Sequence, residues 1–120
     1  MLVTHVYLNG KCKEAIEMYV KAFDATIDTI IEEPNKGDNA IVIHAEICIH
    51  GQQLMLNDNE SLDSGGYQLS VKFQNEEDLN KAYDIIKEES ITIAPMQATD
   101  YSTCVVRFVD KFKVRWAFWV

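Results

Sequence analysis

The chain has 120 residues, of which 48% are hydrophobic and 25% charged, and this fits one globular domain with a proper core. The net charge of −8 would repel a phosphate backbone or an anionic membrane surface, so neither nucleic acid nor a membrane is a predicted partner. No apolar run is long enough to span a membrane and no signal-peptide pattern opens the chain, so a cytoplasmic protein is expected.

The three cysteines, Cys12, Cys48 and Cys104, are widely spaced and form no CxxC pair. This pattern favours reduced thiols, buried as small hydrophobic side chains, over a disulfide framework or a zinc site.

The N-terminal residues predict a strand followed by a helix. Residues 2–8 alternate so that His5 and Tyr7 share one side of a strand. In the segment 9–25, apolar side chains recur at three-and-four spacing, which places them on one face of an amphipathic helix. That helical face needs a sheet to cover it.

The rest of the first half predicts three strands, with a turn at 34–39. In the strand expected at 40–50, alternation places His44 and Glu46 on an unusually polar face. The apolar positions expected on its core face are Ile41, Ile43, Ala45, Ile47 and Ile49. The three strands expected here span residues 26–31, 40–50 and 53–56.

The second half repeats this order after the polar stretch from Asn57 to Gly66, which is either a linker or a mobile loop. Asn75 is expected to cap a helix whose first turn is acidic, a good match to the helix dipole. The strands expected in this half span residues 67–73, 90–94, 103–109 and 114–120.

The order strand, helix, three strands therefore occurs twice, and we predict an α+β domain over residues 1–120 made of two βαβββ modules. The first module is expected at about 1–60 and the second at about 66–120. Each helix would cover one sheet face and leave a more polar face bare, so the two modules are expected to enclose a cleft.

Three blocks of sequence stand out in order over nearly the full chain. They are Asn9-Gly10-x-Cys12-x-Glu14-Ala15-Ile16-x-x-Tyr19-x-x-Ala22-Phe23, His44-Ala45-Glu46 with Leu54-Met55-Leu56-Asn57-Asp58, and Asp110-Lys111-Phe112-x-Val114-x-Trp116. Together they resemble the PhnB-like branch of the glyoxalase/bleomycin-resistance/extradiol dioxygenase (vicinal oxygen chelate) superfamily. The resemblance implies modules that curl into a cupped mixed sheet, a ligand cavity on the concave face and a homodimer.

Metal-dependent members of this superfamily hold a metal with four ligands, mostly His and Glu, from the first, fourth, fifth and eighth strands. By strand order and face, the resemblance places His5, Met55, Gln68 and Ala117 at these positions. Because Met55 and Ala117 offer no hard donor, we predict no metal and no cofactor. A register shift of one residue would place Asn57 where Met55 stands.

Two positions depart from the family pattern, because glycine is usual where this chain has Asp24 and Lys113. A glycine there would permit a positive φ at a helix end and at the last hairpin. Asp tolerates that conformation moderately and Lys tolerates it poorly, so a different turn geometry is expected at Lys113.

On the last strand, alternation places Arg115 and Trp119 toward the cleft, and a hairpin centred on Lys111 would set Arg107 directly opposite Arg115. A carboxylate or phosphate ligand between the two guanidinium groups would offset their repulsion. An internal acid such as Glu46 would do the same, or both groups could simply reach solvent.

His44 and Glu46 lie two residues apart on one strand face and suit either an acid-base pair or part of a relocated metal site with His5. A structural hydrogen bond between the two side chains is the more common use of such a pair.

The leading hypothesis is a protein that binds a small organic ligand and needs no metal. In one version of this hypothesis the ligand is anionic. The catalytic residues are unknown, and the predicted cleft residues are His5, Tyr7, His44, Glu46, Gln68, Arg107, Arg115 and Trp119. One alternative is a metal-dependent lyase or oxygenase of the glyoxalase or dioxygenase type, and a second is a structural or interaction protein.

Overall fold

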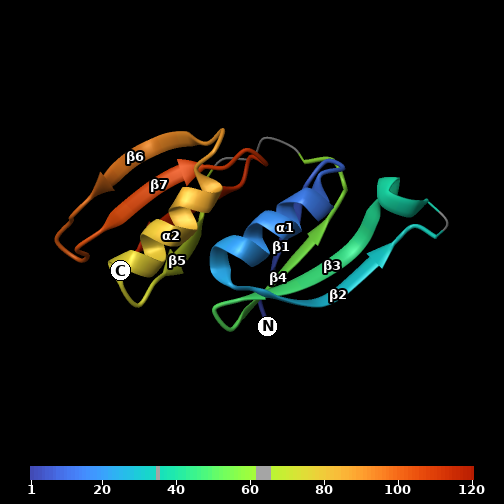
Figure 1. Ribbon diagram of the computed structural model, residues 1–120, viewed down its shortest axis with the longest axis horizontal. Coiled ribbons are helices and arrows are strands. Elements are labelled where there is room, and N and C mark those ends of the chain that lie inside the picture. The colour runs from blue at the N-terminus through green and yellow to red at the C-terminus, as the bar shows by residue number, and fades with distance from the viewer. Residues whose placement is uncertain (35, 62–65) are drawn as a thin grey trace. The chain divides into compact units, whose positions relative to one another are not determined.

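The computed structural model describes residues 1–34, 36–61 and 66–120, and the chain forms two compact units, Met1–Asp63 and Ser64–Val120 (Figure 1). Each unit contains a strand, a helix and three further strands in that order. The prediction of an α+β fold built from two βαβββ modules is therefore confirmed. Residue 35 of the expected turn and residues 62–65 of the expected polar loop lie outside the described residues.

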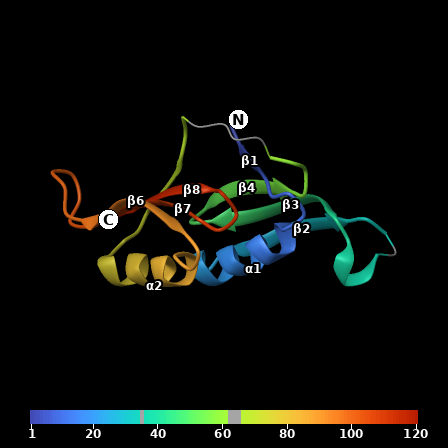
Figure 2. The same ribbon diagram turned by 90° about the horizontal axis from the view of Figure 1, so that it is seen from above.

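The first unit is a four-stranded sheet with one helix along one of its faces (Figure 2). Its elements are β1 (Thr4–Tyr7), α1 (Cys12–Phe23), β2 (Thr26–Glu32), a short 3-10 turn η1 (Gly37–Asn39), β3 (Val42–Ile49) and β4 (Gln52–Asn57). The strand order is β1-β4-β3-β2, with β1 parallel to β4 and the other neighbours antiparallel. The core lies between α1 and the sheet and contains Ile16, Tyr19, Ile47, Leu54 and Leu56.

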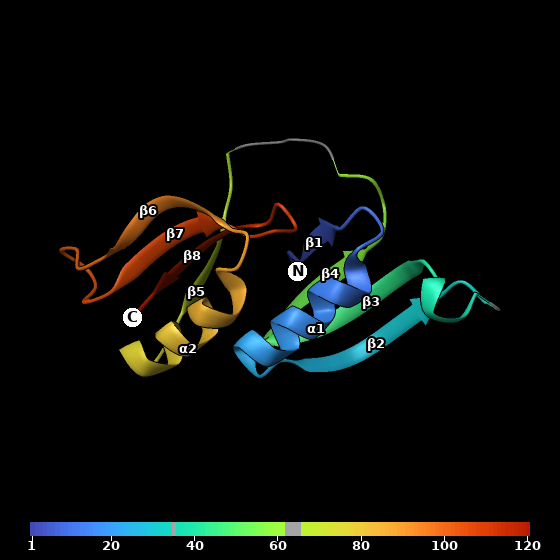
Figure 3. The ribbon, with the colours of Figure 1, turned by 45° about the horizontal axis from the view of Figure 1, so that its top comes forward.

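The second unit repeats this arrangement (Figure 3). Its elements are β5 (Leu69–Lys72), α2 (Glu76–Ile86), β6 (Ile91–Gln97), β7 (Val105–Val109) and β8 (Arg115–Trp119), in the sheet order β5-β8-β7-β6. Its core contains Leu79, Ile86, Phe108, Trp116 and Phe118. Asn75 caps α2 as predicted, because its side-chain oxygen accepts a 2.8 Å hydrogen bond from the backbone N–H of Asp78.

Both residues at positions where the resemblance predicts glycine adopt the left-handed conformation. Asp24 ends α1 with φ of 53°, and Lys113 lies in the β7–β8 hairpin with φ of 68°. The expectation of a non-left-handed turn at Lys113 is therefore wrong. The Asp110 carboxylate accepts hydrogen bonds from the backbone N–H groups of Phe112 and Val114, and these bonds hold the backbone in this conformation in spite of the Lys side chain.

The predicted inward face of β3 is wrong at its N-terminal end. Val42 is 1% exposed, whereas Ile41 and Ile43 are 49% and 55% exposed. Val42 pairs with Glu32 and His44 pairs with Ile31, so Ile43 is an extra residue that forms a β-bulge. A bulge reverses the alternation of side chains along a strand, so Val42 faces the core before the bulge and the predicted core face holds only from Ala45 onward.

Strand β6 is longer than predicted, because it continues through Pro95 to Gln97. This strand is at the edge of its sheet, where the missing N–H of a proline costs no ladder hydrogen bond. The pairing with β7 is irregular on both sides of Ala94, next to the proline.

Candidate functional site

In the first unit, the predicted site residues gather on the sheet face opposite α1. The register places His5 beside Met55 and Met55 beside Glu46, so these three side chains form a row across β1, β4 and β3. Tyr7 lies two residues after His5 and shares its face, with the two rings edge to face at 5.5 Å between centroids. The structure thus brings together four of the eight predicted residues, which are His5, Tyr7, His44 and Glu46.

Asn57 is the member of this cluster that the sequence analysis left out of the site. Its side-chain nitrogen lies 3.0 Å from Nε2 of His5, and its side-chain oxygen accepts a 2.9 Å hydrogen bond from the backbone N–H of Asn59. Asn57 is 5% exposed, among the few polar side chains that are buried. Its place two residues beyond Met55, on the same face of β4, was the sequence signal that could have identified it.

His44 is held by the carboxylate of Glu46, with 3.3 Å between Nε2 and Oε1. Both side chains are partly exposed, and the ring of His44 meets the ring of His5 edge to face at 5.8 Å. Partial burial, and then the nearby charge of His44, hold the pKa of His5 below its ordinary value. The face therefore favours a neutral His5.

In the second unit, the sheet face opposite α2 is cationic. Arg107, Arg115 and Lys72 lie on it, together with Trp119, whose ring has the Lys72 ammonium group 5.0 Å from its centroid. The side chains on this face of β5, β7 and β8 are Ser70, Lys72, Val105, Arg107, Val109, Arg115, Ala117 and Trp119. None of them is acidic, in a chain whose net charge is −8.

The predicted pairing of Arg107 with Arg115 is wrong. Arg107 pairs with Ala117 and Arg115 pairs with Val109, so the hairpin is centred on Phe112. Both arginines keep the predicted face of the sheet. Moving the centre of the hairpin by one residue changes the pairing partner of each arginine by two positions, and residues two apart on a strand share a face. Gln68, the remaining predicted residue, is exposed and lies just before the start of β5.

The donors at the superfamily's metal positions do not suit a divalent metal. Met55 offers a thioether and Ala117 offers no donor. Nε2 of His5 already faces the amide nitrogen of Asn57, and Gln68, which has an amide oxygen, lies exposed before the start of β5. Within residues 1–34, 36–61 and 66–120, there is no group of three His, Cys, Asp or Glu side chains placed to hold a metal ion.

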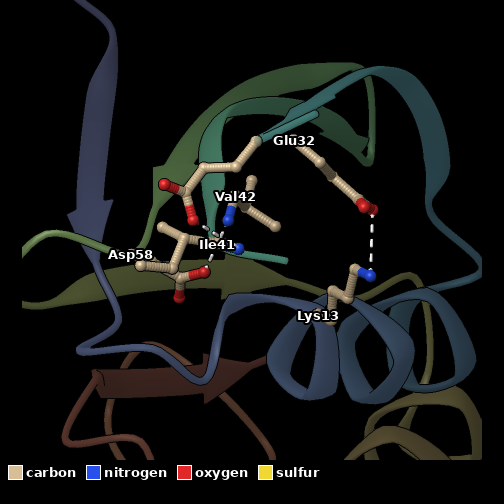
Figure 4. A network of polar contacts seen from close by, with 6 residues as sticks. Lys13, Glu32, Ile41, Val42 and Asp58 are labelled. Atoms are coloured by element: carbon tan, nitrogen blue, oxygen red, sulfur yellow. Dashed lines mark hydrogen bonds and ion pairs between the residues drawn. The ribbon is translucent and has the colours of Figure 1, made fainter. Parts of the chain in front are cut away.

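Two acids of the family-like sequence blocks have structural partners instead. Asp58 accepts a 2.7 Å hydrogen bond from the backbone N–H of Val42 (Figure 4). It also accepts a 2.8 Å hydrogen bond from the backbone N–H of Cys12, and so joins the start of α1 to the start of β3. Asp110 is 3% exposed and receives three hydrogen bonds within the last hairpin. These acids hold the backbone that carries the two sheet faces.

Comparison with known proteins shows similarity in structure and not in sequence. No protein-family model matches the chain, and no curated protein has a significant match to it.

Among the helices of the structure, within the described residues, none is long and apolar enough to span a membrane.

Three of the solved structures that share the fold illustrate the likeness. The PhnB protein of Bacillus cereus is 23% identical with a TM-score of 0.85, over 98% of this chain and 97% of that chain. The fosfomycin resistance protein FosX of Mesorhizobium loti is 10% identical with a TM-score of 0.69, over 99% and 89%. A glyoxylase/bleomycin resistance protein/dioxygenase domain of a Frankia species is 16% identical with a TM-score of 0.63, over 99% and 93%.

These likenesses extend over nearly the whole chain and confirm the fold that the three sequence blocks predicted. Because all three identities are below 25%, they establish the architecture and leave the activity to be argued from the residues. The chain has the fold of the glyoxalase/bleomycin-resistance/extradiol dioxygenase superfamily, in the form found in its PhnB-like branch.

Proposed function

We propose that this chain is a PhnB-like protein that binds a small organic acid on the helix-free faces of its sheets, without the superfamily's metal ion. The observation that carries the proposal is the acid-free face of β5, β7 and β8, where Lys72, Arg107 and Arg115 lie with Trp119. Guanidinium groups bind carboxylate and phosphonate groups through paired N–H donors, and an indole ring offers apolar contact to the rest of a ligand.

The first unit supports the same proposal from its own face. His5 and Tyr7 supply aromatic surface, while His44 and Glu46 supply a few polar groups. A face with aromatic rings and a small number of placed polar groups is typical of small-molecule binding. One structural neighbour, FosX, is named as a fosfomycin resistance protein, which is in keeping with an antibiotic-like ligand for this fold.

A thermal-shift screen with matched ligand pairs tests this function. Each pair consists of a carboxylate or phosphonate and its uncharged amide or ester analogue, because a ligand that binds only the folded state raises the melting temperature. Acidic members are expected to stabilise the protein more than their neutral analogues. A hit is then titrated calorimetrically against the wild type, Arg115→Ala and the control variant Lys81→Ala.

Arg115→Ala removes a cation of the proposed site, whereas Lys81→Ala removes an exposed cation of α2. A charged hydrogen bond contributes about 1.5–3 kcal/mol, so the arginine variant is expected to bind an acidic hit about tenfold more weakly or worse. The lysine variant should bind as the wild type does. An acidic ligand that binds Arg115→Ala as tightly as the wild type would contradict the proposal that this face binds the ligand.

Metal analysis separates this function from the alternative of a lyase or oxygenase. Untagged protein is incubated with zinc, nickel, manganese or iron(II), dialysed and measured by elemental analysis. We expect no stoichiometric retention, because the four metal positions carry the thioether of Met55, Ala117 without a donor, the engaged ring of His5 and Gln68, which lies outside β5. Retention of one metal per chain would overturn the proposal and would favour His5, His44 and Glu46 as ligands.

We also propose that the protein acts as a homodimer. The edge strand β2 exposes Ile27 and Ile30, 49% and 39% accessible, on one face of the sheet, where they pair with Ile47 and Ala45. Exposed apolar residues on an edge strand mark an interaction surface. Sedimentation velocity should give a dimer for the wild type and a smaller species for a variant carrying Ile27→Lys and Ile30→Lys. A wild-type monomer at micromolar concentration would contradict this assembly.

A further inference from the structure

We infer that Asn57 fixes His5 as a neutral imidazole with its proton on Nδ1, so that His5 is a hydrogen-bond donor to a bound ligand and is closed to a metal at Nε2. The ligand atom that it would meet is an acceptor oxygen, such as that of a carboxylate, phosphonate or carbonyl group. The role toward a ligand rests on the proposed function, whereas the state of the ring does not.

The orientation of the Asn57 amide follows from Asn59. The backbone N–H of Asn59 is a donor and lies 2.9 Å from the side-chain oxygen of Asn57. Turning the amide over would set its NH2 group against that N–H, with two donors facing each other. The oxygen is therefore held by Asn59, and the NH2 group is the end that faces His5.

The protonation of His5 follows from the orientation of that amide. An amide NH2 group only donates, so Nε2 of His5, at 3.0 Å, must accept with its lone pair. A neutral imidazole that accepts at Nε2 carries its proton on Nδ1. Protonating Nε2, or placing a metal on it, would require this hydrogen bond to break.

The groups that face His5 agree with a neutral ring. They are Tyr7 on its own strand, Met55 and Asn57 on β4, and His44 with Glu46 on β3. Glu46 is bound to Nε2 of His44, and this nitrogen therefore carries a proton because a carboxylate accepts only. The carboxylate is thus engaged with His44, and within the described part of the chain no acid bonds to His5.

Nδ1 of His5 is the atom left for a ligand. His5 is exposed, and its only hydrogen bond among the described residues is the one to Asn57. A neutral donor of fixed direction on an exposed ring adds hydrogen-bond specificity without adding charge to the face. Asn57 is accordingly a positioning residue, since it acts through His5.

Nitrogen-15 NMR of the imidazole rings in the ligand-free protein tests the inference directly. Near neutral pH, His5 is expected to show a protonated Nδ1 and an unprotonated Nε2, with its signals assigned through the variant His5→Gln. In Asn57→Asp, the carboxylate can still accept the hydrogen bond from the backbone N–H of Asn59. It has no N–H to donate to Nε2 of His5, so a hydrogen bond between the two side chains then needs a proton on Nε2. We expect this variant to move the proton to Nε2 and to raise the pKa of His5.

The control variant is Gln53→Glu, which adds a carboxylate to the same strand and the same face without a bond to His5. It should leave the proton on Nδ1. The inference would be overturned if wild-type His5 carried its proton on Nε2 or were doubly protonated near neutral pH. It would also be overturned if Asn57→Asp left the protonation site and the pKa of His5 unchanged. Because these spectra need no ligand, a failed ligand screen would count against the proposed function alone.

Discussion

The indole nitrogen of Trp116 donates a 2.9 Å hydrogen bond to Oδ2 of Asp110, across the hairpin between β7 and β8. The other carboxylate oxygen accepts from the backbone N–H groups of Phe112 and Val114, at 2.9 and 3.0 Å. A further bond joins the backbone N–H of Asp110 to the carbonyl of Val114. One buried acid thus organises the whole turn, including the left-handed Lys113.

Replacing Asp110 with Ala would leave three donors without their acceptor, two of them backbone N–H groups of the turn. Each unsatisfied buried donor costs about 1–3 kcal/mol, so Asp110→Ala is expected to lower the free energy of unfolding by at least about 3 kcal/mol. Trp116→Phe removes the indole donor alone, and the two variants can be compared by urea denaturation. Equal losses in both would show that the two backbone bonds contribute little.

Asp58 has the corresponding role in the first unit, where it joins the N-terminus of α1 to β3. Its carboxylate also lies at the positive end of a helix dipole. Asp58→Ala is therefore expected to lower the free energy of unfolding by about 2–4 kcal/mol, measured in the same urea series.

The matched control for Asp58 is Lys13→Ala, which removes an ion pair of 3.1 Å with Glu32 near the same end of α1 (Figure 4). Both partners are about one third exposed, and surface pairs of this kind contribute about 0–1 kcal/mol. A lysine variant as unstable as the aspartate variant would contradict the assigned role of Asp58.

The order of strands and helices could be predicted from the sequence because each element has a local signal. The apolar face of α1 and the cap at Asn75 depend on residues within a few positions of one another. The bulge at Ile43 has no such signal, since alternating apolar residues continue through it. Pairing with β2 decides its position, and that contact comes from another part of the chain.

The same limit applies to the candidate site. The faces of His5, Arg107 and Arg115 could be predicted because parity along a strand needs no partner. The contact between His5 and Asn57 is diagonal across β1 and β4, where the direct partner of His5 is Met55. Side-chain length and orientation decide such a contact, and neither can be deduced from the spacing of residues.

Cysteine reactivity is expected to differ among the three thiols. Burial, with a smaller effect of Asp58, raises the pKa of Cys12 to about 12. Near pH 8 only about one part in ten thousand of such a thiol is ionised, so Cys12 should not react while the protein is folded. Burial, and then Glu76, also raises the pKa of Cys104. Cys48 is only partly buried and should react first.

Ellman's reagent measures this difference. The native protein should release about one fast equivalent, and the unfolded protein should release three. Cys48→Ser should lose the fast phase. If that variant kept it, Cys12 or Cys104 would be accessible in the folded protein.

Stability at acid pH should depend on His5. Its pKa in the folded protein is lowered from the ordinary value of 6.5, first by burial and then by the charge of His44, whereas the unfolded chain keeps that ordinary value. The unfolded state therefore binds a proton as the pH falls below 6.5, before the folded state can do so. The contribution of His5 is complete above 6.5 and is lost as the pH falls from there to the folded pKa.

Urea denaturation at several pH values between about 7.5 and about 5 would reveal this loss. His5→Gln should flatten the acid side of the profile, because the group that titrates differently in the two states is gone. His50→Asn removes another imidazole, at the turn between β3 and β4, and an asparagine tolerates the left-handed φ of 49° there. That control should keep the acid-side loss. If His5→Gln kept it as well, the loss would come from other titrating groups.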